Sequence, residues 1–238
     1  MIVATEKKLK ASKKRIFLRD GRELQYHTPL REIDKAVPLI SLLPEKGIRH
    51  LEVEIGPGKG EFLARLALNN PNHFFVGIDR RLDRSRLTEN KLKRLNNEGA
   101  AAPANWLILK EDARCFLAAG LPRIQRLHVY HPDPWPKSRH HKNRFFRSPD
   151  AKAWAEAIVV GGNLSLSTDH RDYFEEILDI VESWGFLTPL MIWQKTSDCG
   201  EPLTHFEKIF LSKNEPVFKA VFRRIVTEEQ GDSNESSV

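Results

Sequence analysis

The pattern of apolar and polar positions becomes regular from about residue 50 onward. Short apolar runs, typical of buried strands, alternate there with stretches in which apolar residues recur every three or four positions, as on one face of a helix. The apolar runs predict strands over residues 50–55, 73–79, 105–109, 126–130, 163–167, 190–194 and 217–223. The helical spacing predicts helices over residues 61–68, 84–97, 113–119, 149–160 and 173–184.

This order of elements predicts an α/β fold with a Rossmann-like, mostly parallel sheet of seven strands. Strands that alternate with helices are joined by right-handed crossovers, which cover both faces of the sheet. The last two strands have no predicted helix between them, so we expect a hairpin that forms an antiparallel edge. Ligands of such sheets bind at the carboxyl ends of the strands, near the point where the strand order reverses. The chemistry is therefore expected directly after each strand.

Composition places the chain among ordinary folded proteins, since 40% of its 238 residues are hydrophobic and 29% are charged. We divide it into a basic N-terminal arm with a helix over residues 32–43 (1–48), a single domain (49–226) and a disordered acidic tail (227–238). Two cysteines argue against a disulfide framework or a zinc cluster and favour a reducing, cytoplasmic setting. No apolar run approaches the ~20 residues of a membrane helix, and we expect neither a membrane partner nor a bound metal.

Positive charge is concentrated in two parts of the chain, whose net charge is +6 and whose pI is near 9.3. Residues 1–31 hold nine Lys or Arg against three acids, and residues 137–147 form a second basic block. Basic patches predict a polyanionic partner, with nucleic acid as the first candidate. A basic face that is merely solvated is the alternative, and charge alone does not decide between the two.

A glycine-rich loop follows the first predicted strand. Gly56, Gly58 and Gly60 let the backbone approach a ligand closely. A dinucleotide fingerprint would place its third glycine at position 61, which is Glu61 here, and this argues against NAD. The G-x-G-x-G spacing instead resembles the first motif of Rossmann-like methyltransferases, whose cofactor is S-adenosylmethionine.

Acidic residues stand at the ends of three successive predicted strands: Glu54, Asp79 and Asp112. S-adenosylmethionine is a sulfonium cation without phosphates, so carboxylates around the loop are compatible with it. Glu54 suits its methionine end, Asp79 can accept from both ribose hydroxyls, and Asp112 can accept from the adenine amine. The alternative is a tight turn with two helix-capping acids and no ligand.

The fourth predicted strand runs into the sequence HPDPWPK at residues 131–137. Three prolines cannot lie inside a strand or helix, so this segment is expected to be a rigid loop. Rigid loops at the carboxyl end of a strand are good places for chemistry. An Asp followed by Pro and an aromatic residue at this point resembles the catalytic loop of base-amino methyltransferases, and a purely structural turn is the alternative.

The longer run PDPWPKSRHHKNR, residues 132–144, resembles the signature of the tRNA (guanine-N7)-methyltransferase family, PDPW-x-K-x-R-H-x-K-R-R followed by Ser-Pro. Three further segments are similar to that family: EIGPGKGEF, STDHRDYFEEIL and LTHFEKIF. The resemblance covers about residues 48–224. It implies a Rossmann-like, S-adenosylmethionine-dependent enzyme that methylates N7 of a guanine in tRNA, with the variable-loop guanine as the expected target.

The resemblance also implies roles for individual residues. Cofactor contacts would come from Glu54, Gly56, Gly58, Asp79, Asp112 and Asp133, of which Asp133 would also be the catalytic residue. The substrate site would be lined by Lys137, Asp169, Thr204, His205, Phe206 and Glu207. Contacts to tRNA would come from Arg139, His140, His141, Lys142, Asn143 and Arg144. The chain departs from the family at Asn143, which interrupts the basic run, and at Pro57, where many members have an aromatic residue.

Guanine N7 carries an in-plane lone pair and no hydrogen, so its methylation needs alignment and electrostatic stabilisation rather than a base. Asp133, Asp169 and Glu207 are each candidates for the carboxylate that hydrogen-bonds the guanine edge. A methyltransferase with another substrate would leave the basic block unexplained. A non-catalytic RNA-binding protein with this fold would leave the acids and the rigid loop of residues 131–137, which we call the PDPW loop, unexplained. The oligomeric state stays open.

Overall fold

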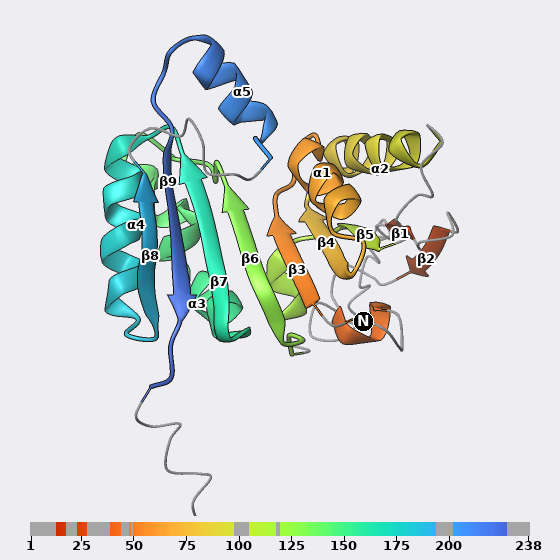
Figure 1. Ribbon diagram of the computed structural model, residues 1–238, viewed down its shortest axis with the longest axis horizontal. Helices are drawn as coiled ribbons and strands as arrows, with labels where there is room; N and C mark the ends of the chain where they lie inside the picture. Colours follow the sequence, from red (N-terminus) through yellow and green to blue (C-terminus); the bar gives the residue numbers. More distant parts are fainter. Residues whose placement is uncertain are drawn as a thin grey trace, which may run out of the picture.

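The computed structural model describes residues 13–17, 23–27, 39–43, 48, 50–97, 105–117, 120–193 and 202–227. Its centre is a nine-stranded sheet in the order β2-β1-β5-β4-β3-β6-β7-β9-β8 (Figure 1). The strands are β1 (Lys13–Phe17), β2 (Glu23–His27), β3 (His50–Ile55), β4 (His73–Asp79), β5 (Trp106–Lys110), β6 (Ile124–Tyr130), β7 (Ile158–Thr168), β8 (Leu187–Trp193) and β9 (Phe218–Arg224). The α-helices are α1 (Glu61–Asn69), α2 (Leu82–Asn97), α3 (Pro149–Glu156), α4 (Arg171–Ser183) and α5 (His205–Ser212). Short 3₁₀ helices are η2 (Leu39–Leu42), η3 (Ala113–Phe116), η4 (Ser138–Asn143) and η5 (Phe145–Arg147).

Seven of these strands are those that the sequence predicts. β5, β4, β3, β6 and β7 run parallel to one another. β9 lies antiparallel between β7 and β8, and β8 is the outermost strand, so these two strands form the expected antiparallel edge. The predicted fold class is therefore confirmed. The chain runs from β3 toward β5 on one side and later from β6 toward β7 on the other, so the strand order reverses between β3 and β6.

The N-terminal segment adds strands that the sequence pattern does not predict. β1 pairs antiparallel with both β2 and β5, and so extends the sheet beyond the expected seven strands. Of the helix expected over residues 32–43, the structure describes only residues 39–43, which contain the short 3₁₀ helix η2. Residues 228–238 of the expected acidic tail lie outside the described residues.

Two expectations about helices are wrong. The helix that begins after Ser148 ends at Glu156 rather than at residue 160, because the β-branched run Ile158-Val159-Val160 fits a strand better than a helix and opens β7. The positive φ of Gly161 (80°) lies where β7 shifts its register against β6. In addition, α5 lies between the last two strands, where no helix is expected. Its Thr204–Glu207 capping box is a sequence signal for a helix start that apolar spacing alone does not show.

The two faces of the sheet carry different helices. Successive strand residues point to opposite faces. Val76 belongs to a buried cluster with Trp154 of α3 and Tyr173 of α4, whereas Phe75 belongs to a second cluster with Phe62 of α1. α1 and α2 therefore cover one face, and α3 and α4 cover the other. Within the described residues, no helix is both long enough and apolar enough to cross a membrane.

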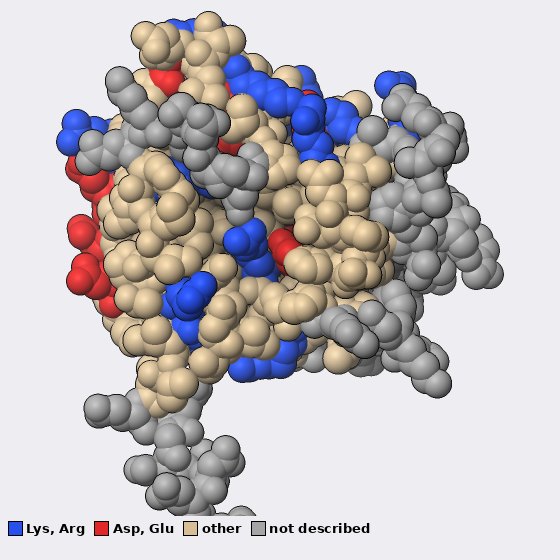
Figure 2. Space-filling view, in the orientation of Figure 1, with Lys and Arg blue, Asp and Glu red and all other residues tan. Residues whose placement is uncertain are grey.

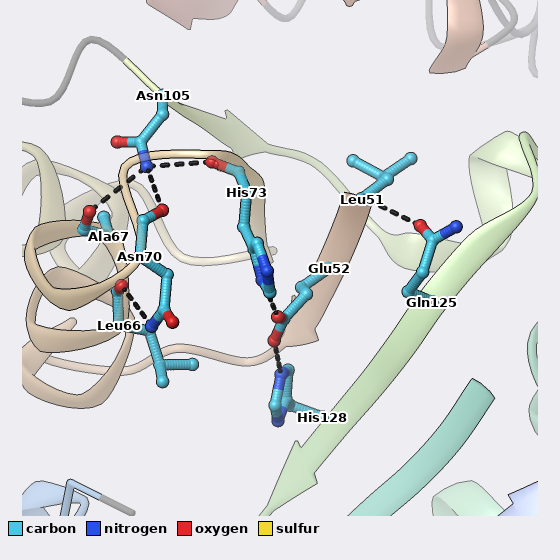
Figure 3. A network of polar contacts seen from close by, with 9 residues as sticks. All are labelled: Leu51, Glu52, Leu66, Ala67, Asn70, His73, Asn105, Gln125 and His128. Atoms are coloured by element: carbon cyan, nitrogen blue, oxygen red, sulfur yellow. Dashed lines mark hydrogen bonds and ion pairs between the residues drawn. The ribbon is translucent and has the colours of Figure 1, made fainter. Parts of the chain in front are cut away.

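Buried polar contacts tie the central strands together (Figure 3). The Glu52 carboxylate of β3 lies 2.7 Å from Nδ1 of His73 on β4 and 2.8 Å from Nε2 of His128 on β6. The Asn105 side-chain amide, just before β5, donates to the carbonyls of Ala67 in α1, of Asn70 and of His73 at the start of β4, at 2.8–3.1 Å. These bonds satisfy buried polar groups and link β3, β4, β5 and β6 at the centre of the sheet.

Candidate active site

The predicted site residues gather at the carboxyl edge of adjacent parallel strands. β3 leads into the glycine loop, β4 ends at Asp79, Asp112 follows β5, and the PDPW loop follows β6. β3 pairs with β4 on one side and with β6 on the other, with Ile55 opposite both Ile78 and Val129. These loops therefore surround the point where the strand order reverses, which is where sheets of this type bind ligands.

The glycine loop has free space at its first glycine. Gly56, Gly58 and Gly60 have φ values of 75°, 59° and 68°, a region that favours glycine. A Cβ at Gly60 would lie 2.3 Å from the Thr88 side chain, so that glycine is required by the packing of α1 on α2. A Cβ at Gly56 would meet no atom within 4 Å. The backbone at Gly56 is therefore open to a ligand.

Glu54 is a buried carboxyl group beside this open space. It is the penultimate residue of β3 and is 4% exposed, and its Oε2 atom has no hydrogen-bond partner within the described part of the chain. Burial, together with the charges of Glu207 and Asp79, raises the pKa of Glu54 to about 8. An orphaned buried carboxyl oxygen fits a cationic ligand, whose charge would compensate the cost of burying the carboxylate. The residues present thus fit the methionine end of S-adenosylmethionine.

Asp79 and Asp112 differ in how far their carboxylates are already engaged. Asp79 accepts a hydrogen bond from the backbone N–H of Arg81 at 2.8 Å, and burial raises its pKa. Burial also acts on Asp112, but the hydrogen bonds from Arg114 outweigh it and lower the Asp112 pKa. The Arg114 guanidinium holds both Asp112 oxygens, at 3.0 and 2.7 Å. Asp79 therefore has more acceptor capacity left for ribose hydroxyls than Asp112 has for adenine.

The PDPW loop is held rigidly. His131 and Trp135 have φ values of 46° and 44°, an uncommon conformation for residues other than glycine. The Arg144 guanidinium donates to the Pro134 carbonyl at 2.8 Å. Asp133 lies between His131 and Trp135 in the chain, and its side chain is exposed. The loop thus presents a carboxylate at the carboxyl edge without having to rearrange.

Arg144 does not face solvent in this structure, and its expected contact with tRNA stays a prediction. The residue is 2% exposed, forms an ion pair with Glu176 of α4, and lies over the Tyr173 ring at 4.6 Å. Its role here is to anchor the PDPW loop to α4. In the rest of the predicted RNA segment, the side chains of Arg139, Lys142 and Asn143 are exposed and those of His140 and His141 are partly exposed. Lys137, just before η4, is exposed as well.

Helix α5 covers the site, and its first turn separates the predicted substrate residues into two groups. Thr204 and Glu207 are buried in the capping box, where the Glu207 carboxylate accepts from the Thr204 backbone N–H at 2.6 Å. The other Glu207 oxygen lies 3.9 Å from Nζ of Lys219, and both residues are 0% exposed. In this structure Glu207 is therefore held inside the protein, and its expected contact with guanine stays a prediction. Phe206 is 39% exposed and His205 is partly exposed at the same helix end.

Two residues that the sequence reasoning missed connect these parts. The His131 ring is stacked on that of Phe210 and tilted against that of Phe206, both on α5, with ring centroids 5.6 Å apart in each case. Its Nδ1 lies 3.4 Å from the Asp169 carboxylate. It thereby joins the PDPW loop, α5 and the end of β7. Lys219 places a buried cation beneath α5. A lysine inside the apolar run of β9 was the available signal for it. Within the described residues, no cluster of three or more His, Cys, Asp or Glu could hold a metal ion.

Comparison with known proteins agrees with this geometry. The family Methyltransf_4, described as "Putative methyltransferase", matches residues 49–220. The tRNA (guanine-N(7)-)-methyltransferase of Alkalilimnicola ehrlichii is 34% identical over 177 residues, covering 72% of this chain and 71% of that protein. The enzyme of the same name from Bacillus subtilis is 30% identical, covering 71% and 78%. For the one from Aquifex aeolicus, also 30% identical, the match covers 75% of this chain and spans 58% of that protein.

Solved structures agree on the fold. The 16S rRNA methyltransferase KamB superposes with a TM-score of 0.59 at 14% sequence identity, covering 89% of this chain and all of that one (100%). An antibiotic-related methyltransferase gives a TM-score of 0.55 at 17% identity, with coverages of 82% and 92%. At such low identity these likenesses concern the arrangement of strands and helices.

Proposed function

The chain belongs to the tRNA (guanine-N7)-methyltransferase family, and from this premise we propose that it transfers a methyl group from S-adenosylmethionine to N7 of a guanine in tRNA. The observation that supports the proposal most directly is the convergence of an orphaned buried carboxyl, an open glycine loop and an exposed Asp133 at one edge of the sheet. The proposal places the protein in the cytoplasm, where tRNA and the cofactor meet.

Residues of three loops would hold the cofactor. Glu54 receives the positively charged methionine end beside Gly56 and Gly58, and Asp79 accepts from the ribose hydroxyls. Asp112 borders the adenine side, where its carboxylate is shared with Arg114. Bound S-adenosylmethionine supplies an electrophilic methyl group on a sulfonium centre. Burial keeps the carboxyl group of Glu54 largely protonated at neutral pH in the free protein. Glu54 must therefore lose its proton to stabilise the positive charge of the methionine end.

Asp133 is the residue that would act on guanine. N7 needs no deprotonation, so the protein must align its lone pair with the methyl group and stabilise the positive charge that moves onto the purine. The Asp133 carboxylate can accept hydrogen bonds from the N1–H and N2–H edge of guanine and supply that negative charge. Arg144, Pro134 and the two positive-φ residues keep it in place. Since Glu207 is buried, Asp169 is the remaining alternative.

Exposed side chains around the loop would receive the RNA. Phe206 and His205 stand where an extruded base could stack, and Asp169 lies beside His131 at the same edge. Lys137, Arg139 and Lys142 would neutralise phosphates of the flanking nucleotides. A guanine in the variable loop is the target that the family resemblance implies.

Mass spectrometry of nucleosides tests the reaction. Unmodified tRNA incubated with the protein and S-adenosylmethionine should yield 7-methylguanosine, located by sequencing the digested fragments. Asp133→Asn keeps the size of the side chain but removes its charge, and should lower the single-turnover rate by about 100- to 1,000-fold. Cofactor and tRNA affinities should stay near wild type.

Asp172→Asn, which changes an exposed carboxylate of α4, is the matched control and should leave the rate unchanged. If the single-turnover rate of Asp133→Asn stays within about threefold of the wild-type rate, the role passes to Asp169. Methylation of a different nucleoside would replace the proposed substrate. Tight binding of tRNA without any methylation would favour a non-catalytic RNA-binding protein.

A further inference from the structure

Three cations gather around one carboxylate beside the glycine loop, and a fourth cation, Lys59, lies within that loop. Glu61, in the first turn of α1, lies 3.9 Å from Arg65 and 3.9 Å from Lys91 of α2 and forms an ion pair with Lys208 of α5. Nζ of Lys59 lies 2.9 Å from Nε2 of His205, whose ring is itself 3.7 Å from Glu61. We call Lys59, Arg65, Lys91 and Lys208 with Glu61 the Glu61 cluster.

The Glu61 cluster has more positive charge than it can neutralise. The cluster holds four cations and one carboxylate, which leaves an excess of three positive charges, and within the described residues no second carboxylate pairs with Arg65, Lys91 or Lys208. Burial and the neighbouring Lys59 lower the pKa of His205 and so favour the neutral form of its ring. A neutral ring can accept a hydrogen bond from Lys59 and adds no positive charge to the cluster. The N-terminus of α1 adds the positive end of a helix dipole. Such an arrangement is unfavourable by itself and becomes favourable when an anion is bound.

The cluster is open to solvent. Arg65 is 55%, Lys91 38% and Lys208 35% exposed at the side chain, whereas Glu61 is only 19% exposed. The positive charge continues along residues 80–97, which hold seven Lys or Arg against two acids. Figure 2 shows this as a band of blue side chains over the end of the molecule where α5, α1 and α2 lie in Figure 1.

Its position complements the basic segment η4. α1 and α2 cover one face of the sheet, whereas η4 is anchored through Arg144 and Glu176 to α4 on the other face. Lys59 lies within the glycine loop and His205 in the first turn of α5, so the cluster borders the candidate active site. A polyanion that crosses the carboxyl edge of the sheet would therefore meet cations on both sides of Asp133.

We propose that the Glu61 cluster is a second binding surface for the phosphodiester backbone of tRNA, on the face of the sheet opposite η4. This inference rests on the proposed function. It adds that the RNA backbone on one side of the target guanine lies along the face of the sheet that α1 and α2 cover. A purely structural clamp for α5 would need only the Lys208–Glu61 pair. Arg65 and Lys91 pair with Glu61 itself and, among the described residues, form no ion pair with α5, and their exposed ends can turn toward phosphates.

The test uses the double variant Arg65→Gln/Lys91→Gln, which leaves Lys208–Glu61 and the glycine loop intact. Its control, Arg123→Gln/Lys152→Gln, removes the same charge at exposed positions just before β6 and on α3. Binding of tRNA is measured by fluorescence anisotropy over a series of salt concentrations. The cluster variant should bind tRNA more weakly, with a salt slope smaller by about 1.4 to 1.8, or 0.7 to 0.9 for each lost phosphate contact. The control should keep the wild-type slope.

Three outcomes distinguish the possibilities. A cluster variant with the wild-type affinity and slope, in a wild-type protein that does methylate tRNA, overturns this inference alone. A wild-type protein that neither binds nor methylates tRNA overturns the proposed function instead. Calorimetry of S-adenosylmethionine binding should give the same affinity in all three proteins, and a loss confined to the cluster variant would assign Arg65 and Lys91 to the cofactor loop rather than to RNA.

Discussion

At the scale of single residues, Glu54 is unusual because its charge state and its proposed ligand are coupled. Its carboxyl group is buried at the end of β3, and burial, reinforced by Glu207 and Asp79, raises its pKa to about 8. The free protein therefore keeps Glu54 mostly protonated at neutral pH, whereas a cationic cofactor favours the ionised form. Binding must then release a proton.

This coupling predicts the pH dependence of cofactor affinity. Affinity for S-adenosylmethionine should rise between about pH 6 and pH 8, by at most about tenfold per pH unit, and level off above the Glu54 pKa. Calorimetry in buffers of different ionisation enthalpy measures the released proton. Glu54→Gln has no proton to lose at this position and should show a flatter profile. An identical profile for the two proteins would remove Glu54 from the cofactor site.

At the scale of elements, Glu52 links β3 to the strands on either side of it. Burial opposes ionisation of Glu52, but its contacts with His128 and His73 prevail and lower its pKa to about 2. A carboxyl whose pKa falls on folding stabilises the protein above its ordinary pKa of 4.5, and this contribution is lost as the pH falls toward 2. Glu52 therefore supports the fold at neutral pH.

Glu52→Gln should lower the free energy of unfolding by about 1.5–3 kcal/mol, as for buried hydrogen bonds to a charged group. In a protein of this size that corresponds to a melting temperature lower by about 3–12 °C. Differential scanning calorimetry provides the measurement. Glu175→Gln, which removes an exposed partner of Arg171, is the matched control and should cost less than about 1 kcal/mol. Equal effects of the two substitutions would show that the contacts of Glu52 with the histidines do not stabilise the sheet.

Arg144 acts between elements as well, because it fastens the PDPW loop to α4. Arg144→Gln removes the ion pair with Glu176 and weakens the bond to Pro134, at a cost of about 1–3 kcal/mol. The loop that carries Asp133 should then lose its fixed geometry, so single-turnover methylation should slow while the salt slope of tRNA binding stays as in wild type. A reduced slope with a normal rate would instead return Arg144 to the group of phosphate contacts.

At the scale of the whole molecule, positive charge lies on both faces of the sheet at its carboxyl edge. The exposed Arg139 and Lys142 of η4 form the side that the sequence itself predicts. Arg139→Gln/Lys142→Gln should weaken binding of every tRNA alike and reduce the salt slope by about 1.4 to 1.8, without changing cofactor affinity. Filter binding at several salt concentrations provides the measurement. A normal slope would mean that this face is only solvated.

Most of the fold follows from the sequence, because strands and helices differ in local period. Apolar runs and helical spacing predict the seven central strands and the helices α1, α2 and α4 at nearly their observed positions. The pattern fails where local signals are weak or conflict. The short lysine-rich β1 has too few apolar positions to show a period, and the β-branched residues after Glu156 extend β7 at the expense of α3.

A glycine loop, acids at strand ends and a proline-rich turn are local features, so the residues at the carboxyl edge can be identified from the chain alone. Which of those side chains can meet a ligand depends on how the chain packs. Arg144 is buried by Glu176, 32 residues away, and Glu207 by the capping of α5 above Lys219. The Glu61 cluster is assembled from α1, α2 and α5. Burial and net local charge depend on partners that are distant along the chain, and no local pattern can specify them.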